Sequence, residues 1–239
     1  MVSYRAQLIS RETQDLSFGL TALKTSADKI LYEVRLQHSL EQTIQLIGYT
    51  TEERDPYTAG HQRRVADLCS KIATELGLSP DRIHGLYLAA SIHDLGKIGI
   101  PAEILSKPRT LSEMEFGLIK EHVIIGFNIL KDVDFPWPIA QIILQHHERI
   151  DGSGYPKGLK NDAILLESKI LAVADVVEAM TSHRPYRGAL GIEAALREIT
   201  AQSGITLDAP IVDACLRIFN EQHYSFEESP DLQLQRDLE

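Results

Sequence analysis

The amino-acid sequence predicts an all-α fold. Apolar side chains recur at steps of three and four along several segments, polar capping residues stand where those segments begin, and no segment alternates apolar and polar residues as a half-buried strand does. Hydrophobic residues make up 44% of the 239 residues, charged residues 24% and aromatic residues 6%. These proportions are typical of a globular protein whose core is built mainly from aliphatic side chains.

The region from residue 1 to about 50 is expected to form a helical extension. It contains no proline, and Gly19 and Gly48 are its only glycines. One helical stripe consists of apolar residues three or four positions apart, namely Leu16, Leu20, Leu23, Ala27, Ile30 and Val34. Such a stripe suits a short coiled coil that joins two chains in a homodimer, and it equally suits a helix packed on its own domain. Gln37 interrupts the rhythm, so any coiled coil is short.

The main domain is expected over residues 51–224, as a set of helices with recognisable ends. Ser79 supplies an N-cap before a proline, and the apolar run that follows continues to Gly96. Ser112 and Glu115 form a capping box that begins another helix. Further helices are expected from about Pro138 to His147, from Leu166 to Met180, from Ile192 to Ile199 and from Ala209 to Asn220.

Composition limits the partners and the compartment. The formal net charge of −10 opposes sequence-independent binding to DNA, RNA or anionic membranes, which requires a basic surface. The sequence contains no run of about 18 apolar residues, the length needed to span a membrane, so no membrane insertion is expected. The first residues lack the apolar core of a signal peptide. Cys69 and Cys215 stand in apolar stretches and are expected to be buried free thiols. A cytoplasmic location is therefore expected, and residues 225–239 form a polar, acidic tail.

Seven side chains in the main domain are candidate metal ligands. They are His61, His93, Asp94, His122, His146, His147 and Asp175. Taken singly, each has an ordinary explanation: a histidine capped by its neighbour, a satisfied core histidine, or an aspartate paired with a buried arginine. Asp175 is the most demanding, because it interrupts an apolar helix and its burial is costly unless a metal or a cation pairs with it. His122 is expected in the middle of a helix, near its apolar face.

Together the seven side chains indicate a metal centre. Five imidazoles and two carboxylates from separate helices suit Fe, Mn, Zn or a similar metal. Seven ligands exceed the usual demand of a single ion, and a shared Asp94 would create a pair of metals. A metal pair lowers the pKa of a bridging water and holds both oxygens of an in-line displacement, which is the arrangement used for phosphodiester cleavage.

Two stretches carry a family resemblance: His93-Asp94-Leu95-Gly96-Lys97-Ile98, and His146-His147-Glu148 through Gly154-Tyr155-Pro156. With them, residues 51–222 resemble the HD-GYP family, a branch of the HD-domain metal-dependent phosphohydrolases. The resemblance implies an HD-type helical bundle with an N-terminal helical extension. It further implies an enzyme that hydrolyses cyclic di-GMP to pGpG, and to GMP if the pocket holds the linear product. Two divalent ions, Fe or Mn first among them, and a hydroxide that bridges them would serve the reaction.

The resemblance also implies a role for each residue. His61, His93, Asp94 and Asp175 would hold one ion, and Asp94 would bridge to a second ion held by His122, His146 and His147. Lys97 would face the scissile phosphate and stabilise its charge. Further substrate contacts would come from Gly152, Gly154, Tyr155, Pro156, Arg184 and Arg187. Arginine suits both phosphate and guanine, because its planar fork binds oxygens in pairs and stacks on a base.

One position departs from the family pattern. Some relatives carry a glutamate one helical turn before the first histidine, which serves a third metal, and Tyr57 stands there in this sequence. A two-metal centre is therefore expected. Glu53 lies two turns before His61 and would have to reach further to take part.

Two alternatives stay open. An HD-type hydrolase could act on another nucleotide, such as a different cyclic dinucleotide or a guanosine polyphosphate. Gly154-Tyr155-Pro156 argues against the polyphosphate, because generic HD enzymes lack that stretch. A catalytically silent cyclic di-GMP receptor would have lost ligands, whereas this sequence keeps all seven candidates and Lys97.

Overall fold

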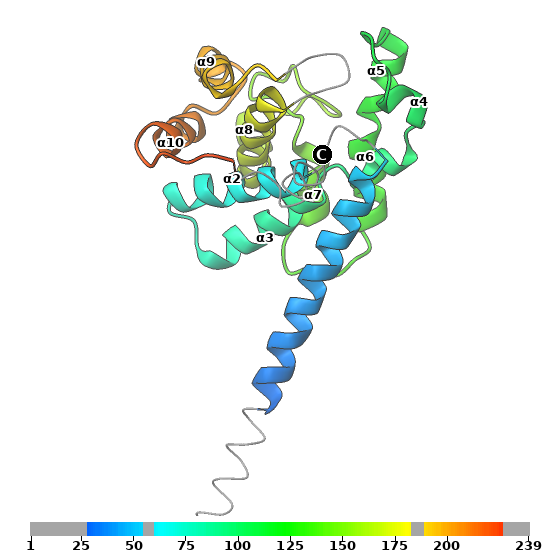
Figure 1. Cartoon of the computed structure of the whole chain (residues 1–239), viewed down its shortest axis with the longest axis vertical. Coiled ribbons are helices and arrows are strands. Elements are labelled where there is room, and N and C mark those ends of the chain that lie inside the picture. Colours follow the sequence, from blue (N-terminus) through cyan, green and yellow to red (C-terminus); the bar gives the residue numbers. More distant parts are fainter. Residues whose placement is uncertain (1–27, 55–59, 183–188, 227–239) are drawn as a thin grey trace, which may run out of the picture. The chain divides into compact units, whose positions relative to one another are not determined.

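A computed structural model describes residues 28–54, 60–182 and 189–226 of the chain. Every regular element in these ranges is a helix, apart from two isolated β-bridges, so the all-α prediction is confirmed (Figure 1). An N-terminal helix covers residues 28–52. The elements after it are α2 (His61–Glu75), α3 (Pro80–Ser91), the 3-10 helix η1 (Leu95–Gly99), α4 (Ala102–Leu105), α5 (Glu113–Lys120), α6 (His122–Leu130), α7 (Ile139–Gln145), the 3-10 helix η2 (Asn161–Ala163), α8 (Leu166–Thr181), α9 (Ile192–Gln202) and α10 (Ala209–Asn220).

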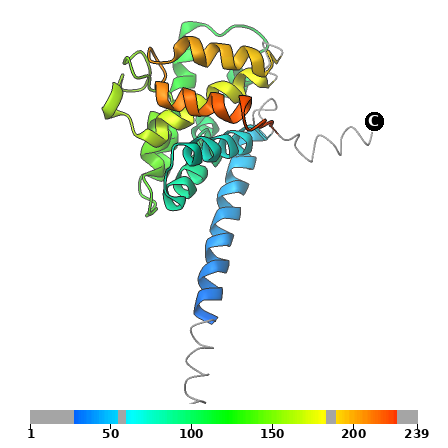
Figure 2. The same ribbon diagram turned by 90° about the vertical axis from the view of Figure 1, so that its left-hand side faces the viewer.

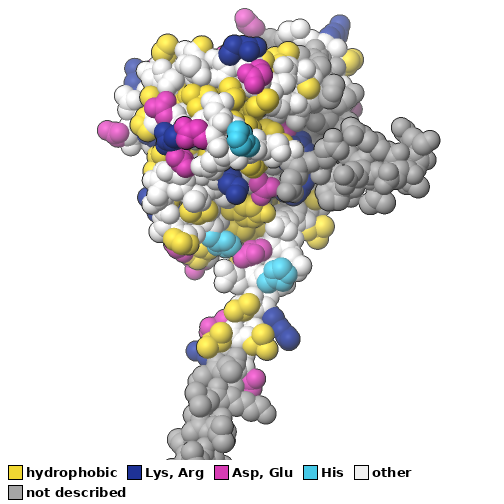
Figure 3. Space-filling model, turned by 60° about the vertical axis from the view of Figure 1, so that its left-hand side comes forward, with side chains coloured by type: hydrophobic (Ala, Val, Ile, Leu, Met, Phe, Trp, Pro, Cys, Tyr) yellow, Lys and Arg dark blue, Asp and Glu magenta, His cyan; other side chains and the backbone are white. Residues whose placement is uncertain are grey.

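The chain forms two compact units, residues 1–43 and 44–239. In the first unit the described residues are helical, and two members of the apolar stripe, Ile30 and Val34, are 60% and 58% exposed. Figure 3 shows hydrophobic side chains at the surface of this helix. The stripe members before residue 28 lie outside the described residues. The predicted domain limits, after residues 50 and 224, stay a prediction.

The second unit is a helical bundle around α2, α3 and α8. α2 packs against α3 and α8, α10 packs against α2 and α8, and α9 packs against α8. Figure 2 shows α9 and α10 side by side, as their contact requires. The core between the helices includes Leu68, Ile72, Ile143, Leu171 and Ile199, none of which has exposed surface. Cys69 and Cys215 are buried free thiols, as predicted. Over the described ranges, no helix combines the length and the apolar character needed to span a bilayer.

α3 begins as predicted but ends early. The Ser79 hydroxyl accepts a hydrogen bond from Arg82 N at 3.4 Å and caps the helix. The sequence predicted a helix through to Gly96, which is wrong, because α3 ends at Ser91 and Ile92 has a φ of −134°. The chain continues as η1, which lies directly against α6: a Cβ on Gly96 would stand 1.8 Å from His122 O. This tertiary contact, rather than the apolar pattern, decides the path of the backbone.

The prediction that His122 lies in the middle of a helix is also wrong. α5 begins at the predicted capping box, where Ser112 Oγ accepts from Glu115 N at 3.3 Å, and ends at Lys120. α6 then begins at His122 itself. At the break, Glu121 N bonds to Leu118 O at 3.1 Å, in the tighter pattern of a 3-10 turn. The change of direction leaves the His122 side chain 1% exposed.

The remaining helices follow the sequence closely. α7 and α8 lie where apolar periodicity predicted them. α9 reaches Gln202 instead of Ile199, and α10 has the predicted bounds. α10 matches because its start and its end are both marked locally, by a proline in the first turn and by the loss of apolar spacing.

Candidate metal centre

Helix ends bring the seven predicted ligands to one place. Six of them lie at helix ends or in the turns between helices: His61, His93, Asp94, His122, His146 and His147. Asp175 alone lies within a helix, α8. Neighbours on a helix point about 100° apart, so His146 and His147 can converge only because α7 ends just before them.

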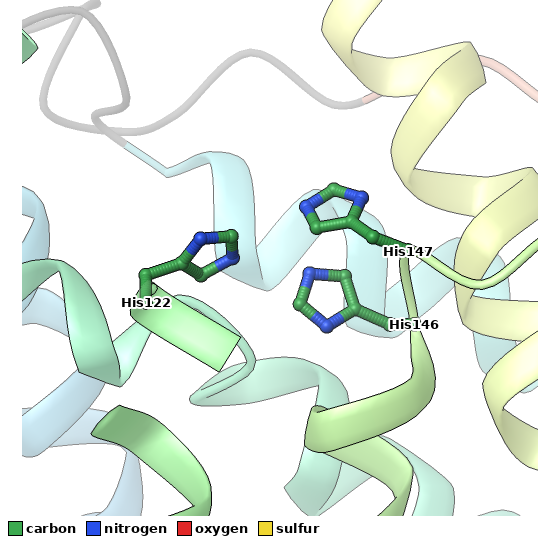
Figure 4. A group of neighbouring side chains, drawn as sticks. All are labelled: His122, His146 and His147. Carbon is green, nitrogen blue, oxygen red and sulfur yellow. The ribbon is translucent and has the colours of Figure 1, made fainter. Parts of the chain in front are cut away.

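Three groups of donor atoms could hold a metal ion. In each group, one donor atom per residue lies within 4.8 Å of the others. The groups are His122, His146 and His147; His61, His93 and Asp94; and His93, His146 and Asp175. Figure 4 shows the first group, in which three imidazoles from the start of α6 and the end of α7 face one another. Because the groups share members, the donors form one continuous cluster suited to divalent metal ions.

Asp94 lies between the groups. Its Oδ2 is 3.9 Å from His61 Nε2 and 3.6 Å from His93 Nε2. Its Oδ1 is 3.5 Å from His122 Nε2. The two oxygens of one carboxylate therefore face imidazoles of different groups. Lys97 follows one turn later on η1, and its Nζ lies 2.7 Å from Oδ2.

Hydrogen bonds to the backbone aim three of the imidazoles into the cluster. Nδ1 of His93 bonds to Ala90 O at 2.8 Å, and Nδ1 of His122 bonds to Ile119 O at 2.6 Å. His146 bonds in the same way to the carbonyl three residues before it, at 2.6 Å. A carbonyl oxygen only accepts, so each Nδ1 carries the proton and each Nε2 presents a lone pair.

Two of those lone pairs have no other use in the described structure. Nε2 of His122 and Nε2 of His146 are buried and have no hydrogen-bond partner among the described residues. Buried polar atoms are almost always satisfied, because an orphaned one loses its hydration without compensation. A metal ion would satisfy both atoms, so this donor set fits a resident metal.

Glu178, on α8, belongs to the site, although sequence analysis did not identify it as a candidate. Its fully buried carboxylate accepts hydrogen bonds from His61 Nδ1, from Arg64 Nε at 2.8 Å and from Ser182 Oγ at 2.6 Å. Burial alone would raise the pKa of Glu178, but His61 and Arg64 outweigh it and lower the pKa to about 2. The ionised carboxylate orients His61, whose Nε2 lies 3.4 Å from Asp175 Oδ1. The sequence offered one signal that could have identified Glu178: it is a second acidic residue, one helical turn after Asp175, in an apolar helix.

Glu52 is a second residue that sequence analysis did not identify. Its buried carboxylate accepts from Gly60 N at 2.8 Å and from Gln62 N at 2.7 Å, so it caps the start of α2 on both sides of His61. Glu53, the residue weighed as a distant ligand, is exposed. Tyr57, the basis for expecting no third metal, lies outside the described residues.

The surroundings hold the ligands in the protonation states that metals bind. Burial lowers the pKa of His146 to about 3 and lowers the pKa of His147 well below its usual value. Burial would raise the pKa of Asp94, but Lys97 and the nearby imidazoles outweigh it and hold the pKa well below the usual range. Burial would likewise raise the pKa of Asp175, but His61 outweighs it and holds the pKa well below the usual range. Neutral imidazoles and ionised carboxylates are the forms that coordinate a metal.

The cluster opens into a cavity of about 330 Å³. Its lining residues are His61, Asp94, Lys97, Ile119, His122, His147, Tyr155, Asp175, Val176, Ala179 and Met180. The lining therefore combines candidate ligands and an ammonium group with apolar side chains. This combination suits a ligand that carries both an anionic group and an apolar surface.

The turn predicted to contact the substrate lies beside the imidazoles. Gly152 has a φ of 86°, the left-handed region that favours glycine. At Gly154, a Cβ would stand 2.4 Å from His147 O and from Arg149 N, so the neighbour that requires glycine there is the chain's own backbone. A cis peptide joins Tyr155 to the proline after it, and the Tyr155 ring lies 4.8 Å from the His147 ring, centroid to centroid. The two arginines expected to contact substrate, Arg184 and Arg187, lie outside the described residues.

Known proteins resemble this chain over most of its length. A family model described as HD domain matches residues 35–211. A cyclic di-GMP phosphodiesterase of Thermotoga maritima is 40% identical over 210 residues, which are 87% of this chain and 56% of that protein. The cyclic di-GMP phosphodiesterase response regulator RpfG of Xanthomonas campestris is 42% identical over 178 residues, which are 74% of this chain and 47% of that protein.

A relative with a different named substrate is nearly as similar. The 3'3'-cGAMP-specific phosphodiesterase 1 of Vibrio cholerae is 38% identical over 189 residues, covering 77% of this chain and 43% of that protein. The chain thus spans about half the length of the curated relatives it matches.

Two solved structures share the fold. A cyclic GMP-AMP specific phosphodiesterase of Vibrio cholerae has a TM-score of 0.58 at 21% identity, over 80% of this chain and 52% of that chain. An HDG"Y"P protein from Bdellovibrio bacteriovorus has a TM-score of 0.57 at 23% identity, over 66% of this chain and 51% of that chain. The predicted HD-type helical bundle is confirmed by this likeness, which at such identities concerns the fold alone.

Proposed function

The chain belongs to the HD domain family, as its sequence predicted, and from that membership we propose that it hydrolyses cyclic di-GMP to the linear dinucleotide pGpG. Relatives at 40% and 42% identity are named for action on cyclic di-GMP. If the pocket retains pGpG, we propose that a second cleavage gives GMP. A cytoplasmic location is part of the same proposal.

The position of Asp94 is the observation that supports the proposal most. Its two oxygens face imidazoles of different groups, as a ligand shared by two ions would. We propose that one divalent ion is held by His61, His93, Asp94 and Asp175, and a second by Asp94, His122, His146 and His147. Fe or Mn fits this mixture of imidazole and carboxylate donors. When bound, the ions supply positive charge to the phosphoryl oxygens and acidify a water molecule.

Lys97 is the chain's own catalytic cation in this proposal. Its ammonium lies 2.7 Å from Asp94 Oδ2, and its side chain is 14% exposed, so it is held at the cluster and within reach of the cavity. There it stabilises the negative charge that builds on a phosphoryl oxygen of the scissile phosphate. It can also donate a proton to the 3′ oxygen as that oxygen leaves.

The rest of the cavity would orient the dinucleotide. The apolar lining residues Ile119, Val176 and Met180 would offer surface to a flat base. Tyr155, which lines the cavity beside His147, adds aromatic surface to the lining. Contacts from the Gly152–Pro156 turn, from Arg184 and from Arg187 remain part of the proposal.

A second candidate substrate is 3'3'-cGAMP, because a relative at 38% identity is named as specific for it. Both compounds are cyclic dinucleotides with two 3′–5′ phosphodiesters, so the metal cluster and Lys97 would serve either one. The base contacts would decide between them. A silent receptor is the least supported alternative, since the cluster keeps all seven donors together.

The test uses the purified chain loaded with Mn(II) or, without oxygen, with Fe(II). Cyclic di-GMP and 3'3'-cGAMP are supplied in parallel, products are separated by chromatography, and metal content is measured on the same samples. Protein stripped with a chelator is the control. We expect pGpG from cyclic di-GMP in the loaded samples only. Turnover of 3'3'-cGAMP alone would favour the second candidate, and tight binding without any product would favour the receptor.

We further propose that the N-terminal helix joins two chains in a homodimer. Its exposed Ile30 and Val34 stand one turn apart on the same face, an arrangement that two copies could bury together. The double change Ile30→Glu, Val34→Glu should turn a dimer into a monomer in light-scattering measurements. Lys29→Gln, on the same helix, is the control. A monomeric wild-type chain would contradict the proposal.

A further inference from the structure

We infer that Lys120 binds the substrate phosphate that is not being cleaved. The inference rests on the proposed function, because it assumes a dinucleotide with two phosphodiesters. One phosphodiester must lie at the metal ligands and Lys97. The other lies across the cyclic ring from it, so it cannot reach the same cluster and needs a separate cation.

Lys120 lies at the edge of the metal cluster. It is the last residue of α5, and its Nζ lies 5.2 Å from the centre of the Tyr155 ring. That ring in turn lies 4.8 Å from the ring of the proposed ligand His147. Ile119, the residue before Lys120, lines the cavity. A single aromatic ring therefore separates the Lys120 ammonium from the metal-binding imidazoles.

Two aromatic rings hold the ammonium without neutralising it. The Lys120 Nζ lies 4.8 Å from the centre of the Phe116 ring, one turn earlier on α5, and faces Tyr155 as well. Such contacts attract a cation through the ring quadrupole, and they restrict a side chain that is otherwise flexible. The position of the charge is thereby set before any ligand arrives.

The charge is also available for a ligand. Within the described ranges, Lys120 has no carboxylate within ion-pair distance, whereas Lys97 pairs with Asp94 and Lys107 pairs with Glu115. The other half-buried lysines among the described residues, Lys97, Lys107 and Lys169, each pair with a carboxylate, although the chain as a whole carries a net charge of −10. An anion that enters the cavity would supply the missing counter-ion.

A phosphate is the anion that fits. An ammonium on a four-carbon stem acts as a compact point charge and binds phosphate oxygens without demanding one fixed orientation. The cavity lining, to which the neighbouring Ile119 belongs, has features expected for a dinucleotide site, because it combines candidate ligands and Lys97 with apolar side chains. Lys97 and Lys120 would then hold the two phosphates from opposite ends of the substrate.

The inference predicts a loss of binding that depends on the second phosphate. Lys120→Gln keeps the stem and removes the charge, Lys120→Arg keeps the charge, and Lys131→Gln changes an exposed lysine beyond α6 as the matched control. Binding is measured on Mn-loaded protein with a phosphorothioate analogue of cyclic di-GMP that is cleaved slowly. We expect Lys120→Gln to raise Kd on the order of tenfold, as loss of one charged hydrogen bond does, and the two other variants to stay near wild type.

A substrate with a single phosphodiester separates this role from a structural one. For bis(4-nitrophenyl) phosphate, Lys120→Gln should leave kcat and KM unchanged, while for cyclic di-GMP it should raise KM and leave kcat nearly unchanged. Phe116→Leu, which removes one ring from the ammonium, should raise the same KM by a smaller factor. An equal loss for both substrates, a lower metal content or an unchanged Kd for the analogue would overturn the inference.

Failure of the proposed function would look different. If wild-type protein binds the analogue through Lys120 but cleaves no cyclic dinucleotide, the proposed reaction fails and the Lys120 contact stands. If it cleaves cyclic di-GMP and Lys120→Gln binds the analogue normally, the reaction stands and the contact fails. If the analogue does not bind and no cyclic dinucleotide is cleaved, both are wrong.

Discussion

The carboxylate half of the metal cluster contains an imidazole that a distant side chain orients, whereas the hydrogen bonds that orient imidazoles in the imidazole half are local. The carboxylate half comprises His61, His93 and Asp175, which we propose hold one ion, and the imidazole half comprises His122, His146 and His147, which we propose hold the other. The oxygens of Asp94 face imidazoles of both halves. In the carboxylate half, the Ala90 carbonyl three residues earlier orients His93, but His61 is oriented by Glu178, which comes from another helix 117 positions later. In the imidazole half, His122 and His146 are oriented by carbonyls only three residues before them.

The difference shows which half depends on tertiary packing. The bond between His61 and Glu178 exists only while α2 and α8 pack together. The bonds from His122 and His146 go to backbone carbonyls, which no side-chain substitution removes. We therefore expect single substitutions outside the ligands to damage the carboxylate half more readily than the imidazole half.

Asp94→Ala should have the largest effect, because it removes a carboxylate whose two oxygens face imidazoles of both halves. We expect kcat for cyclic di-GMP to fall on the order of ten-thousandfold, the scale that follows loss of a central catalytic group. Bound metal should fall with it. Product chromatography and elemental analysis measure the two effects, with the exposed Asp132→Ala as control. Normal turnover by Asp94→Ala would refute the assignment of the site.

Glu178→Gln should act on the carboxylate half alone. Without its negative charge, the side chain orients His61 less firmly, and the affinity for one ion should fall roughly 10- to 100-fold while the other ion binds normally. A Mn(II) titration should then separate into two steps. Glu167→Gln is the matched control, since that carboxylate lies on the same helix and pairs with Arg82 at 2.7 Å. Equal weakening of both ions would contradict the division into halves.

Gly96→Ala tests the spacing between Asp94 and the imidazole half. A Cβ at Gly96 would stand 1.8 Å from His122 O and 2.6 Å from Gly126 N, so alanine must push η1 away from α6. We expect a loss of about 1 to 3 kcal/mol in the free energy of unfolding, the usual effect of overpacking, together with weaker metal binding. Urea unfolding measures the first effect.

Gly117→Ala is the control for that change. It lies on α5, where an added Cβ meets nothing within 4 Å, and alanine should raise stability by up to about 1 kcal/mol through helix propensity. If both alanine variants behaved alike, close approach of η1 to α6 would not explain the need for glycine at position 96.

Mild acid should have the smallest of the expected effects, a loss of stability that depends on Glu178 in the carboxylate half. The pKa of Glu178 is lowered from 4.5 to about 2 in the folded protein, so its contribution to stability is present above pH 4.5 and is lost as the pH falls toward 2. Metal-free wild type should therefore lose roughly 1 kcal/mol from this group by about pH 4, and Glu178→Gln should not. Urea unfolding at several pH values compares the two. Parallel curves would show that the carboxylate contributes no such dependence.

Local chemistry made much of the fold predictable. The starts of α3 and α5 follow from Ser79 and Ser112, because an N-cap depends only on residues one turn apart. The bounds of α10 follow from its own apolar spacing and its early proline. Asp175 and His122 stood out because a carboxylate or an imidazole inside an apolar segment is costly without a partner, and the joint pattern of five histidines and two aspartates completed the set of seven.

Contacts between distant segments account for what was missed. α3 stops at Ser91 and α6 begins at His122 because η1 and α6 approach without a side chain between them, and no helical periodicity records that approach. Glu178 and Glu52 gain their roles from His61 and from the start of α2, segments to which no local pattern connects them.

The sequence by itself determined the helical fold, the chemical identity of the donors and the family to which they belong. Only the tertiary structure decided that the two oxygens of Asp94 face different imidazoles and that Glu178 orients His61. Side-chain type and local spacing are properties of neighbouring residues, and the sequence states them directly. The packing of helices that are far apart in the chain fixes where each helix ends. It thereby sets the direction in which a buried side chain points.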